Sequence, residues 1–296
     1  MMDAHEQPIT AVIATKGRVE ELRVVLQSLL DQTSPVSQIN IVDQNEDDVL
    51  RPVIESFPDL PIDWMRRPDL QGLNNSRNAG WQSVSSGLVF FPDDDCWYPV
   101  DFLAKVRALF AEHRPDMLSG RAADENLRSI NGRFLDRAVW VDESTVWFAG
   151  IEWVFFARID VLQQIDGFDG VLGVGALTPW GAGEMQDLLL RAMQTGYRQY
   201  YTPDLYAHHA EFDVRALGSQ AVIKGSSYAH GLGYVLAKHG YGYLSAIKWS
   251  ARPLAKALFS LAVGNLALFR YSLAMARGRM NGYLRARKIF KAEARR

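Results

Sequence analysis

Short apolar runs alternate with amphipathic segments through the first hundred residues. Residues 9–14 and 88–91 are apolar runs of strand length, and 38–44 repeat the buried-strand pattern. Residues 19–32 carry apolar side chains at helical spacing, and 49–57 form a second helix candidate. This alternation predicts an α/β fold with a mostly parallel, doubly wound sheet. Ligands of such sheets bind beyond the carboxyl ends of the strands.

The second half of the chain has a less regular pattern. Residues 101–113 and 184–196 are helix candidates, and the latter ends in a glycine. A strand is expected within 147–157, and 198–209 is an aromatic-rich strand or loop that ends in two histidines. From about residue 215 onward we expect helices.

Length and composition favour one large domain with an appendage. The chain has 296 residues, of which 48% are hydrophobic and 22% charged, as is usual for globular proteins. Its single cysteine, Cys96, excludes an internal disulfide framework or a multi-cysteine zinc site. The first ten residues lack a basic segment followed by an apolar one, so we expect a cytoplasmic protein.

The net charge of −2 conceals a basic C-terminal tail. Residues 241–296 contain twelve Lys and Arg but one acid, Glu293, which gives the tail a net charge of +11 and the rest −13. So basic a segment predicts an anionic partner, either phospholipid or nucleic acid. Nucleic acid is not expected, because no recognised binding motif accompanies the charge.

The same tail contains an apolar stretch between Lys256 and Arg270. It is thirteen residues long and interrupted by Gly264 and Asn265, which is too short to span a bilayer. Its apolar side chains and the many arginines predict helices that lie on an anionic membrane surface. The alternative is an ordinary helical subdomain with solvated arginines. The apolar positions are Leu254, Leu258, Leu261, Leu266 and Phe269.

Three consecutive aspartates, Asp93, Asp94 and Asp95, follow the apolar run 88–91. Like charges this close raise one another's pKa unless a cation lies between them. Carboxylate oxygens suit Mg²⁺ or Mn²⁺, which also bind diphosphates. The sequence therefore predicts a divalent metal site. The alternative is a polar loop that caps a helix beginning near Pro99.

Five ordered segments resemble glycosyltransferase family 2, the inverting enzymes of GT-A fold. They are VIATKGRVEELRVVLQSLLDQ, INIVDQ, GLNNSRNAG, FFPDDDCWYPVDFL and GAGEMQDLLLRAMQTGYRQYYTPDLYAHH, and they lie within residues 8–240. The resemblance implies a GT-A domain over 1–240, with a nucleotide-binding half (about 8–100) and an acceptor and catalytic half (101–240). Residues 241–296 would then be a basic amphipathic helical tail.

The resemblance also implies a donor site. Thr15 and Asp43 match positions that hold the nucleoside. Arg18 and Arg77 match basic positions near the donor phosphates, although Arg18 could instead be a solvated residue at a helix start. Trp180 lies in a loop that would close over the donor or line the acceptor site.

Metal ligands are implied in the same way. Asp93, Asp94 and Asp95 resemble the family's DxD motif, in which Asp95 would bind the metal. Asp93 would contact the ribose, or the metal through water. A histidine after TPDLYA is expected to join the metal or the diphosphate, and strand alternation favours His209 over His208. Both could instead be stacked surface histidines.

The resemblance also implies a catalytic base. The family carries a Glu-Asp-x-Asp pattern at the start of a helix, where this chain has Glu184, Met185 and Asp187. Because Met185 occupies the slot of the usual catalytic Asp, we expect Glu184 to be the base, with Asp187 second. Asp187 could instead pair with Arg191 one turn later, and Glu184 could be a first-turn acid favoured by the helix dipole.

These features predict a metal-dependent inverting glycosyltransferase at the inner face of the cell membrane. Its donor would be a nucleotide sugar, most often a UDP-sugar in this family, and its acceptor a lipid-linked sugar or a polysaccharide. The alternative is a catalytically silent nucleotide-sugar-binding module, which Met185 suggests. A nucleotidyltransferase is not expected, because the Gly-x-Gly-Thr-Arg loop is missing.

Overall fold

A computed structural model describes residues 7–214 and 218–293. The chain divides into two compact units. The first comprises Met1–Leu70, Asn75–Gly167 and Leu188–Glu211, and the second comprises Gln71–Asn74, Phe168–Asp187 and Phe212–Arg296. Residues 212–240 therefore belong to the same unit as the basic tail.

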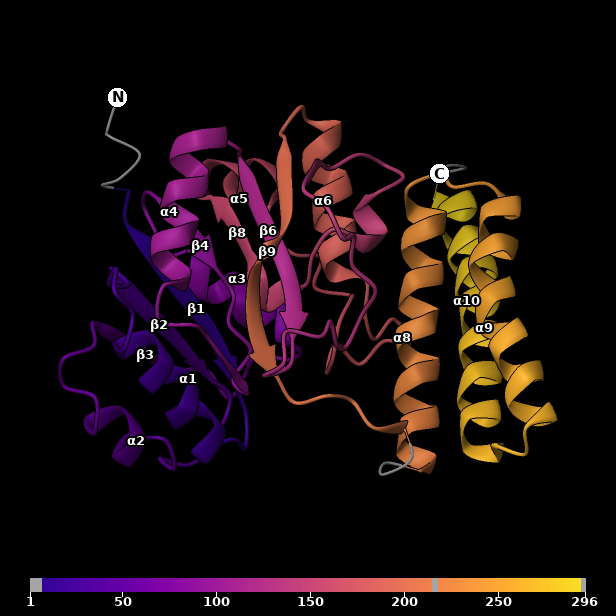
Figure 1. The fold of residues 1–296 in the computed structure, drawn as a ribbon, viewed down its shortest axis with the longest axis horizontal. Coiled ribbons are helices and arrows are strands. Elements are labelled where there is room, and N and C mark those ends of the chain that lie inside the picture. Colours follow the sequence, from indigo (N-terminus) through magenta and orange to yellow (C-terminus); the bar gives the residue numbers. More distant parts are fainter. Residues whose placement is uncertain (1–6, 215–217, 294–296) are drawn as a thin grey trace. The chain divides into compact units, whose positions relative to one another are not determined.

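The elements are shown in Figure 1. The strands are β1 (Ile9–Thr15), β2 (Gln38–Asp43), β3 (Ile62–Arg66), β4 (Leu88–Phe90), β5 (Cys96–Trp97), β6 (Met117–Ala123), β7 (Val139–Trp140), β8 (Phe155–Arg158) and β9 (Gln199–His209). The helices are α1 (Glu20–Leu30), α2 (Arg51–Glu55), α3 (Leu73–Trp81), α4 (Phe102–His113), α5 (Ile159–Ile165), α6 (Glu184–Gln194), α8 (Ser219–Lys238), α9 (Tyr243–Ala262) and α10 (Leu266–Glu293). Two 3₁₀ turns, Val146–Phe148 and Glu152–Val154, precede β8.

One mixed, mostly parallel sheet organises the first unit. In the described residues it has nine strands in the order β3-β2-β1-β4-β8-β6-β9-β5, with β7 paired to β9. Strands β3, β2, β1 and β4 are parallel, as the alternating pattern predicted. Strand β8 runs antiparallel to both β4 and β6, and β6 is again parallel to β9. The sheet confirms the α/β fold class.

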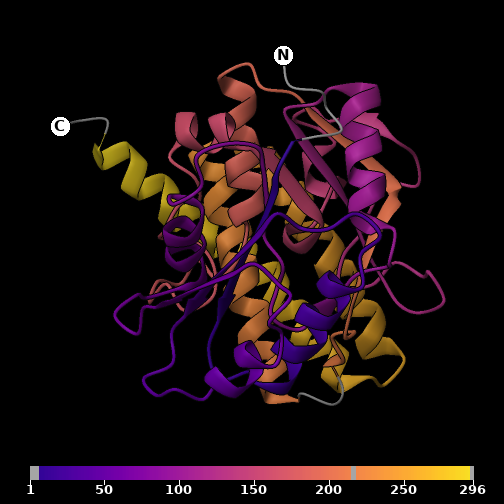
Figure 2. The ribbon, with the colours of Figure 1, turned by 90° about the vertical axis from the view of Figure 1, so that its left-hand side faces the viewer.

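Both faces of the parallel half are covered by helices (Figures 1 and 2). Alternate residues of β1, Ile9, Ala11 and Ile13, belong to a buried apolar cluster with side chains from α1, α2 and α4. On the opposite face, α3 packs so closely that a Cβ at Gly80 would lie 2.4 Å from Val12 Cγ1. Strand β1 is thereby packed between helices on both faces of the sheet.

The C-terminal part of the second unit consists of α8, α9 and α10 (Figure 1). Glycines bring α8 and α10 into close backbone contact. A Cβ at Gly233 would lie 2.2 Å from the Arg279 carbonyl oxygen, and one at Gly282 would lie 2.2 Å from that of His230. Helix α9 packs against α10 and touches α8 only slightly. Much of the α9 surface is consequently exposed.

The apolar stretch of the tail is not one helix. Helix α9 ends at Ala262, Gly264 takes a left-handed conformation with φ of 73°, and α10 begins at Leu266. In residues 7–214 and 218–293, no helix is long and apolar enough to cross a membrane.

Candidate active site

The three aspartates follow the end of β4, in the turn that leads into β5. Helix α4 begins only at Phe102, and Asp101 is its N-cap residue. The alternative that the aspartates cap a helix near Pro99 is therefore wrong. The side chains of Asp93, Asp94 and Asp95 are partly exposed, so they can receive a ligand.

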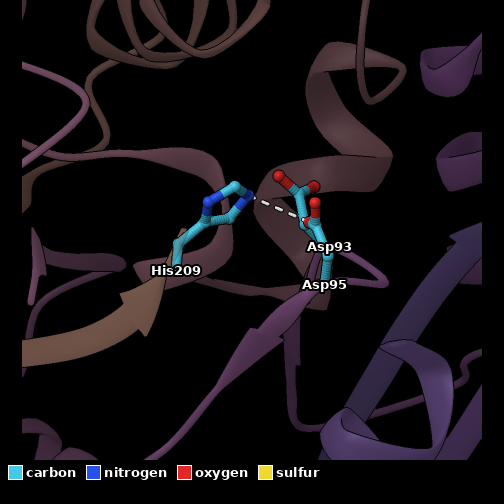
Figure 3. Close-up of side chains that lie close together, drawn as sticks. All are labelled: Asp93, Asp95 and His209. Atoms are coloured by element: carbon cyan, nitrogen blue, oxygen red, sulfur yellow. Dashed lines mark ion pairs between the residues drawn. The ribbon is translucent and has the colours of Figure 1, made fainter. Parts of the chain in front are cut away.

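Asp93, Asp95 and His209 lie together at this edge of the sheet (Figure 3). Each offers one ligand atom, and these atoms all lie within 4.8 Å of one another. Antiparallel pairing of β5 with β9 places His209 opposite Cys96, the residue after Asp95. Two carboxylates and an imidazole form a donor set that suits Mn²⁺ or Mg²⁺, so these residues fit the expected metal.

Two arginines neutralise the carboxylates. Arg77 Nη2 donates a 2.7 Å hydrogen bond to Asp93 Oδ1, and the Arg77 side chain is only 2% exposed. Arg18 Nη1 lies 3.3 Å from Asp94 Oδ1 and also pairs with Asp95. Both guanidiniums thus lie beside the candidate metal ligands, where donor phosphates are expected.

Burial and these cations act differently on the aspartates. Burial raises the pKa of Asp94 to about 6, although Arg18 opposes the shift. Burial also disfavours ionised Asp95, but His209 and Arg18 outweigh it and the pKa of Asp95 lies below its ordinary value. Burial opposes charge on His209, whereas Asp95 raises its pKa above the ordinary value. Asp95 and His209 thus form the charged pair of the cluster.

The His209 ring is held from several sides. Its Nδ1 lies 2.7 Å from the carbonyl oxygen of Ala210, and its Nε2 lies 2.9 Å from Asp95 Oδ1. Asn131 Nδ2 donates a 2.9 Å hydrogen bond to the same Ala210 carbonyl. The Trp153 ring stacks on the imidazole at 4.7 Å. With Nδ1 bonded to the backbone, Nε2 is the nitrogen available to a metal.

His208 points elsewhere. Its Nδ1 lies 3.1 Å from the Ala123 carbonyl oxygen, and its ring stacks on Trp97. The structure therefore separates the two adjacent histidines as strand alternation predicted, and only His209 belongs to the cluster.

Thr15 and Asp43 pair across the ends of β1 and β2. The Thr15 side chain is buried beside Asp94. Asp43 is fully buried, and its carboxylate accepts hydrogen bonds from the backbone and side chain of Asn45 and from Trp64 Nε1. Asn45 and Trp64 thus hold the residue that the resemblance assigns to the nucleoside.

The remaining expected site residues lie in the second unit. Glu184 and Asp187 are in the first turn of α6, with 6% and 0% of their surface exposed. Asp187 Oδ1 lies 2.8 Å from both Lys238 Nζ and His239 Nε2. Lys238 also bonds Asp169 at 2.7 Å. Asp187 is thus part of a buried ion-pair network.

Trp180 is also buried in the second unit. Its ring packs against Tyr234 at 4.9 Å, and the Arg285 guanidinium lies 5.6 Å from its centroid. Gly181, the next residue, donates its N–H to the Ser227 carbonyl. The Trp180 loop is therefore anchored on α8 and α10.

Sequence analysis missed the residues that support the expected site. Asn45, Trp64, Asn131 and Trp153 contact site residues in the first unit, and Lys238 contacts Asp187 in the second. None of these five residues lies in the sequence segments that resemble the family. Only Trp64 carries a weak local signal, because an indole N–H that is removed from water needs an acceptor.

The first half of the chain is similar to a known family. Residues 10–151 match the model described as glycosyl transferase family 2. A protein of Haemophilus influenzae described as an uncharacterized glycosyltransferase is 33% identical over 92 residues. That alignment covers 31% of this chain and 31% of the relative, so the chain matches about a third of the relative's length.

Solved structures show the same fold. S. aureus TarS 1–349 has a TM-score of 0.58 and 17% identity, over 97% of this chain and 92% of that one. Mannosyltransferase PcManGT from Pyrobaculum calidifontis has a TM-score of 0.60 and 17% identity, over 97% of this chain and 88% of that one. These similarities establish the GT-A fold of the chain.

Proposed function

We propose that this chain transfers a sugar from a nucleotide-sugar donor to an acceptor with inversion, and that it needs a divalent metal. The observation that carries the proposal is the group of Asp93, Asp95 and His209 beyond the strand ends of a family 2 sheet. Ligands bind at this edge of open α/β sheets.

Asp95, Asp93 and His209 would hold the ion. When bound, Mn²⁺ or Mg²⁺ would supply positive charge to the departing nucleoside diphosphate. Arg18 and Arg77 would neutralise further phosphate charge, while Thr15, Asp43 and Asp94 would hold the nucleoside portion. The buried Arg77 is pre-positioned for this task because Asp93 fixes its guanidinium.

We assign the general base to Glu184, with Asp187 as the second choice. A general base needs a carboxylate that can accept the acceptor's hydroxyl proton. Asp187 is fully buried and bonded to Lys238 and His239, which favours a structural role for it. Trp180 would line the donor or acceptor side of the site.

The donor and acceptor classes rest on the relatives and on the charge of the tail. TarS was solved with UDP and with UDP-GlcNAc, and PcManGT with GDP-Man and Mn²⁺. We propose a nucleotide-sugar donor, with UDP as the first choice of nucleotide. The basic tail supports a lipid-linked or glycan acceptor at the inner face of the cell membrane.

Donor turnover tests the proposal. Purified protein is incubated with Mn²⁺ or Mg²⁺, a panel of UDP-, GDP- and dTDP-sugars, and membrane extract as acceptor. Nucleoside diphosphate release that requires metal, and that is lost in Asp95→Ala, is the expected result. Loss in Glu184→Gln with unchanged donor binding would support its role as base. Donor binding without turnover would instead indicate a silent binding module.

A further inference from the structure

Helix α9 has its larger apolar side chains on the side that faces away from its own bundle. Its buried residues are small or lack a long side chain: Ala246, Pro253, Ala257 and Ser260. They recur at intervals of seven, four and three, so they form one stripe along the helix. In a soluble bundle the large apolar residues would occupy this stripe.

The outward surface of α9 is instead rich in leucine. Leu244 is 80% exposed, Leu258 60% and Phe259 68%. Near the turn into α10 the surface continues with further exposed apolar side chains. The exposed apolar residues of this surface are Tyr243, Leu244, Ile247, Leu254, Leu258, Phe259, Leu261, Val263 and Leu266, and we call them the α9 face.

This concentration of exposed apolar residues is local. Helices of the first unit also expose single apolar residues, such as Val24 in α1 at 50%. Scattered residues of that kind are normal, whereas a contiguous apolar patch marks an interaction surface. The α9 face is contiguous because Leu254, Leu258 and Leu261 follow one another at helical spacing.

Positive charges accompany the α9 face. Lys248, Arg252 and Lys256 are exposed and recur every four residues, so they form a cationic stripe along the helix. No acidic residue occurs between Asp213 and Glu293. Glu293, the last residue of α10, is thus the one acid in the three helices, and it does not balance the charge of this surface.

The charge pattern decides which partner fits. A second copy pairing through α9 would offer apolar side chains but no acids for the cationic stripe, because α9 contains none, which disfavours self-association. A bilayer with anionic lipids offers both an apolar interior and negative headgroups. We propose that the α9 face is a membrane-docking surface, on which α9 lies in the plane of an anionic bilayer with its leucines among the acyl chains.

This inference rests on the proposed function, since a surface-docked enzyme would meet a lipid-linked acceptor. It also refines the contact expected from the sequence. Of the five apolar positions expected to lie on lipid, the four leucines belong to the α9 face, whereas Phe269 is only partly exposed. Helix α8, which lies against α10, has a single large apolar residue above 60% exposure, Ile223.

Vesicle co-flotation of the full chain tests the docking surface. Vesicles of phosphatidylcholine alone are compared with vesicles of equal parts phosphatidylcholine and phosphatidylglycerol. We expect binding to the anionic vesicles only. Leu258→Ser with Phe259→Ser should weaken binding on the order of tenfold or more, from lost apolar burial. Lys248→Gln, Arg252→Gln and Lys256→Gln together should weaken it about a hundredfold.

Matched controls lie in the first unit. Val24→Ser removes an exposed apolar side chain of α1, and Lys105→Gln removes an exposed cation of α4. Both should bind vesicles like the wild type. Circular dichroism and metal-dependent donor hydrolysis in detergent-free buffer should be unchanged in every variant, because none alters the candidate active site.

A fluorescent label gives a second readout of depth. Cys96, the chain's single cysteine, is buried, so a polarity-sensitive thiol dye would label Leu258→Cys selectively. We expect a blue shift on adding anionic vesicles, and no shift for Val24→Cys.

Two results would overturn the docking surface. One is equal vesicle binding by wild type and by both sets of α9 variants. The other is a concentration-dependent dimer in sedimentation that the Leu258 variant abolishes, which would make the α9 face a contact between copies. Failure of the proposed transferase is distinguishable, because it would appear as absent donor turnover whether or not vesicles are bound.

Discussion

The two groups of carboxylates in this molecule are held in opposite ways. Asp93, Asp94 and Asp95 crowd together at the edge of the sheet, partly exposed, with Arg18, Arg77 and His209 as their neutralising partners. Asp187 is fully buried and bonded to Lys238 and His239. The first group can exchange partners with a ligand, whereas the second holds secondary structure together.

This difference separates residues that should matter for turnover from those that should matter for stability. Like charges that are partly exposed cost folding free energy and favour a bound cation. A buried ion pair with good geometry resists substitution because loss of one partner leaves the other charge uncompensated. The following substitutions test this division.

The largest effect should come from Asp95→Ala. Loss of a ligand from the metal cluster should lower metal-dependent nucleotide release on the order of a thousandfold, with little change in melting temperature. Asp63→Ala, which removes an exposed carboxylate of β3, is the control. Full activity in Asp95→Ala would remove this residue from the site.

Asp187→Ala should act on stability instead. The change leaves Lys238 and His239 without a buried carboxylate, which should reduce the free energy of unfolding by about 3–5 kcal/mol. Urea unfolding measures it, with Asp160→Ala as an exposed control. A variant that keeps its stability but loses turnover would show that Asp187 is the base after all.

Asp94→Asn should stabilise the protein when divalent metal is removed with chelator. The raised pKa of about 6 means that the folded state binds a proton more tightly than the unfolded state, whose carboxyl has a pKa near 3.8. Wild-type stability should therefore fall by about 2–3 kcal/mol as pH rises from 4 through 6, and level off above it.

The substitution removes this titration. The asparagine variant should be more stable than wild type at pH 8, and nearly equal to it at about pH 2, which lies below both pKa values, so that Asp94 is protonated in both states. Urea unfolding across this pH range provides the measurement. Parallel pH curves for the two proteins would contradict the burial of Asp94.

The smallest effect should come from Asn131→Ala. Its side chain bonds the Ala210 carbonyl that orients His209, so its loss should weaken Mn²⁺ binding about tenfold. Electron paramagnetic resonance of free Mn²⁺ measures this without a donor. Asn131→Gln should restore part of the affinity, and an unchanged affinity in Asn131→Ala would show that Trp153 and Ala210 suffice.

Much of the parallel half of the fold could be predicted from sequence. Strands β1 and β4 are short apolar runs, β2 has the pattern of a buried strand, and α1 has its apolar residues at helical spacing, so local pattern and burial agree. Strand β3 is only half-buried, and β6 has the sequence MLSGRAA, which contains no β-branched residue. Neither carries a strong local signal, and pairing with neighbours makes them strands.

The candidate site likewise contains residues that the sequence could predict and residues that only the tertiary structure brought together. The sequence by itself determined the three aspartates, since adjacent carboxylates after a buried strand need a cation whatever the surrounding fold. Only the tertiary structure brought His209 to them, through antiparallel pairing of β5 and β9. Likewise, tertiary structure alone decided that Asp187 is buried against Lys238 and that the leucines of α9 face outward. Contacts between residues far apart in the chain depend on packing, which local sequence does not encode.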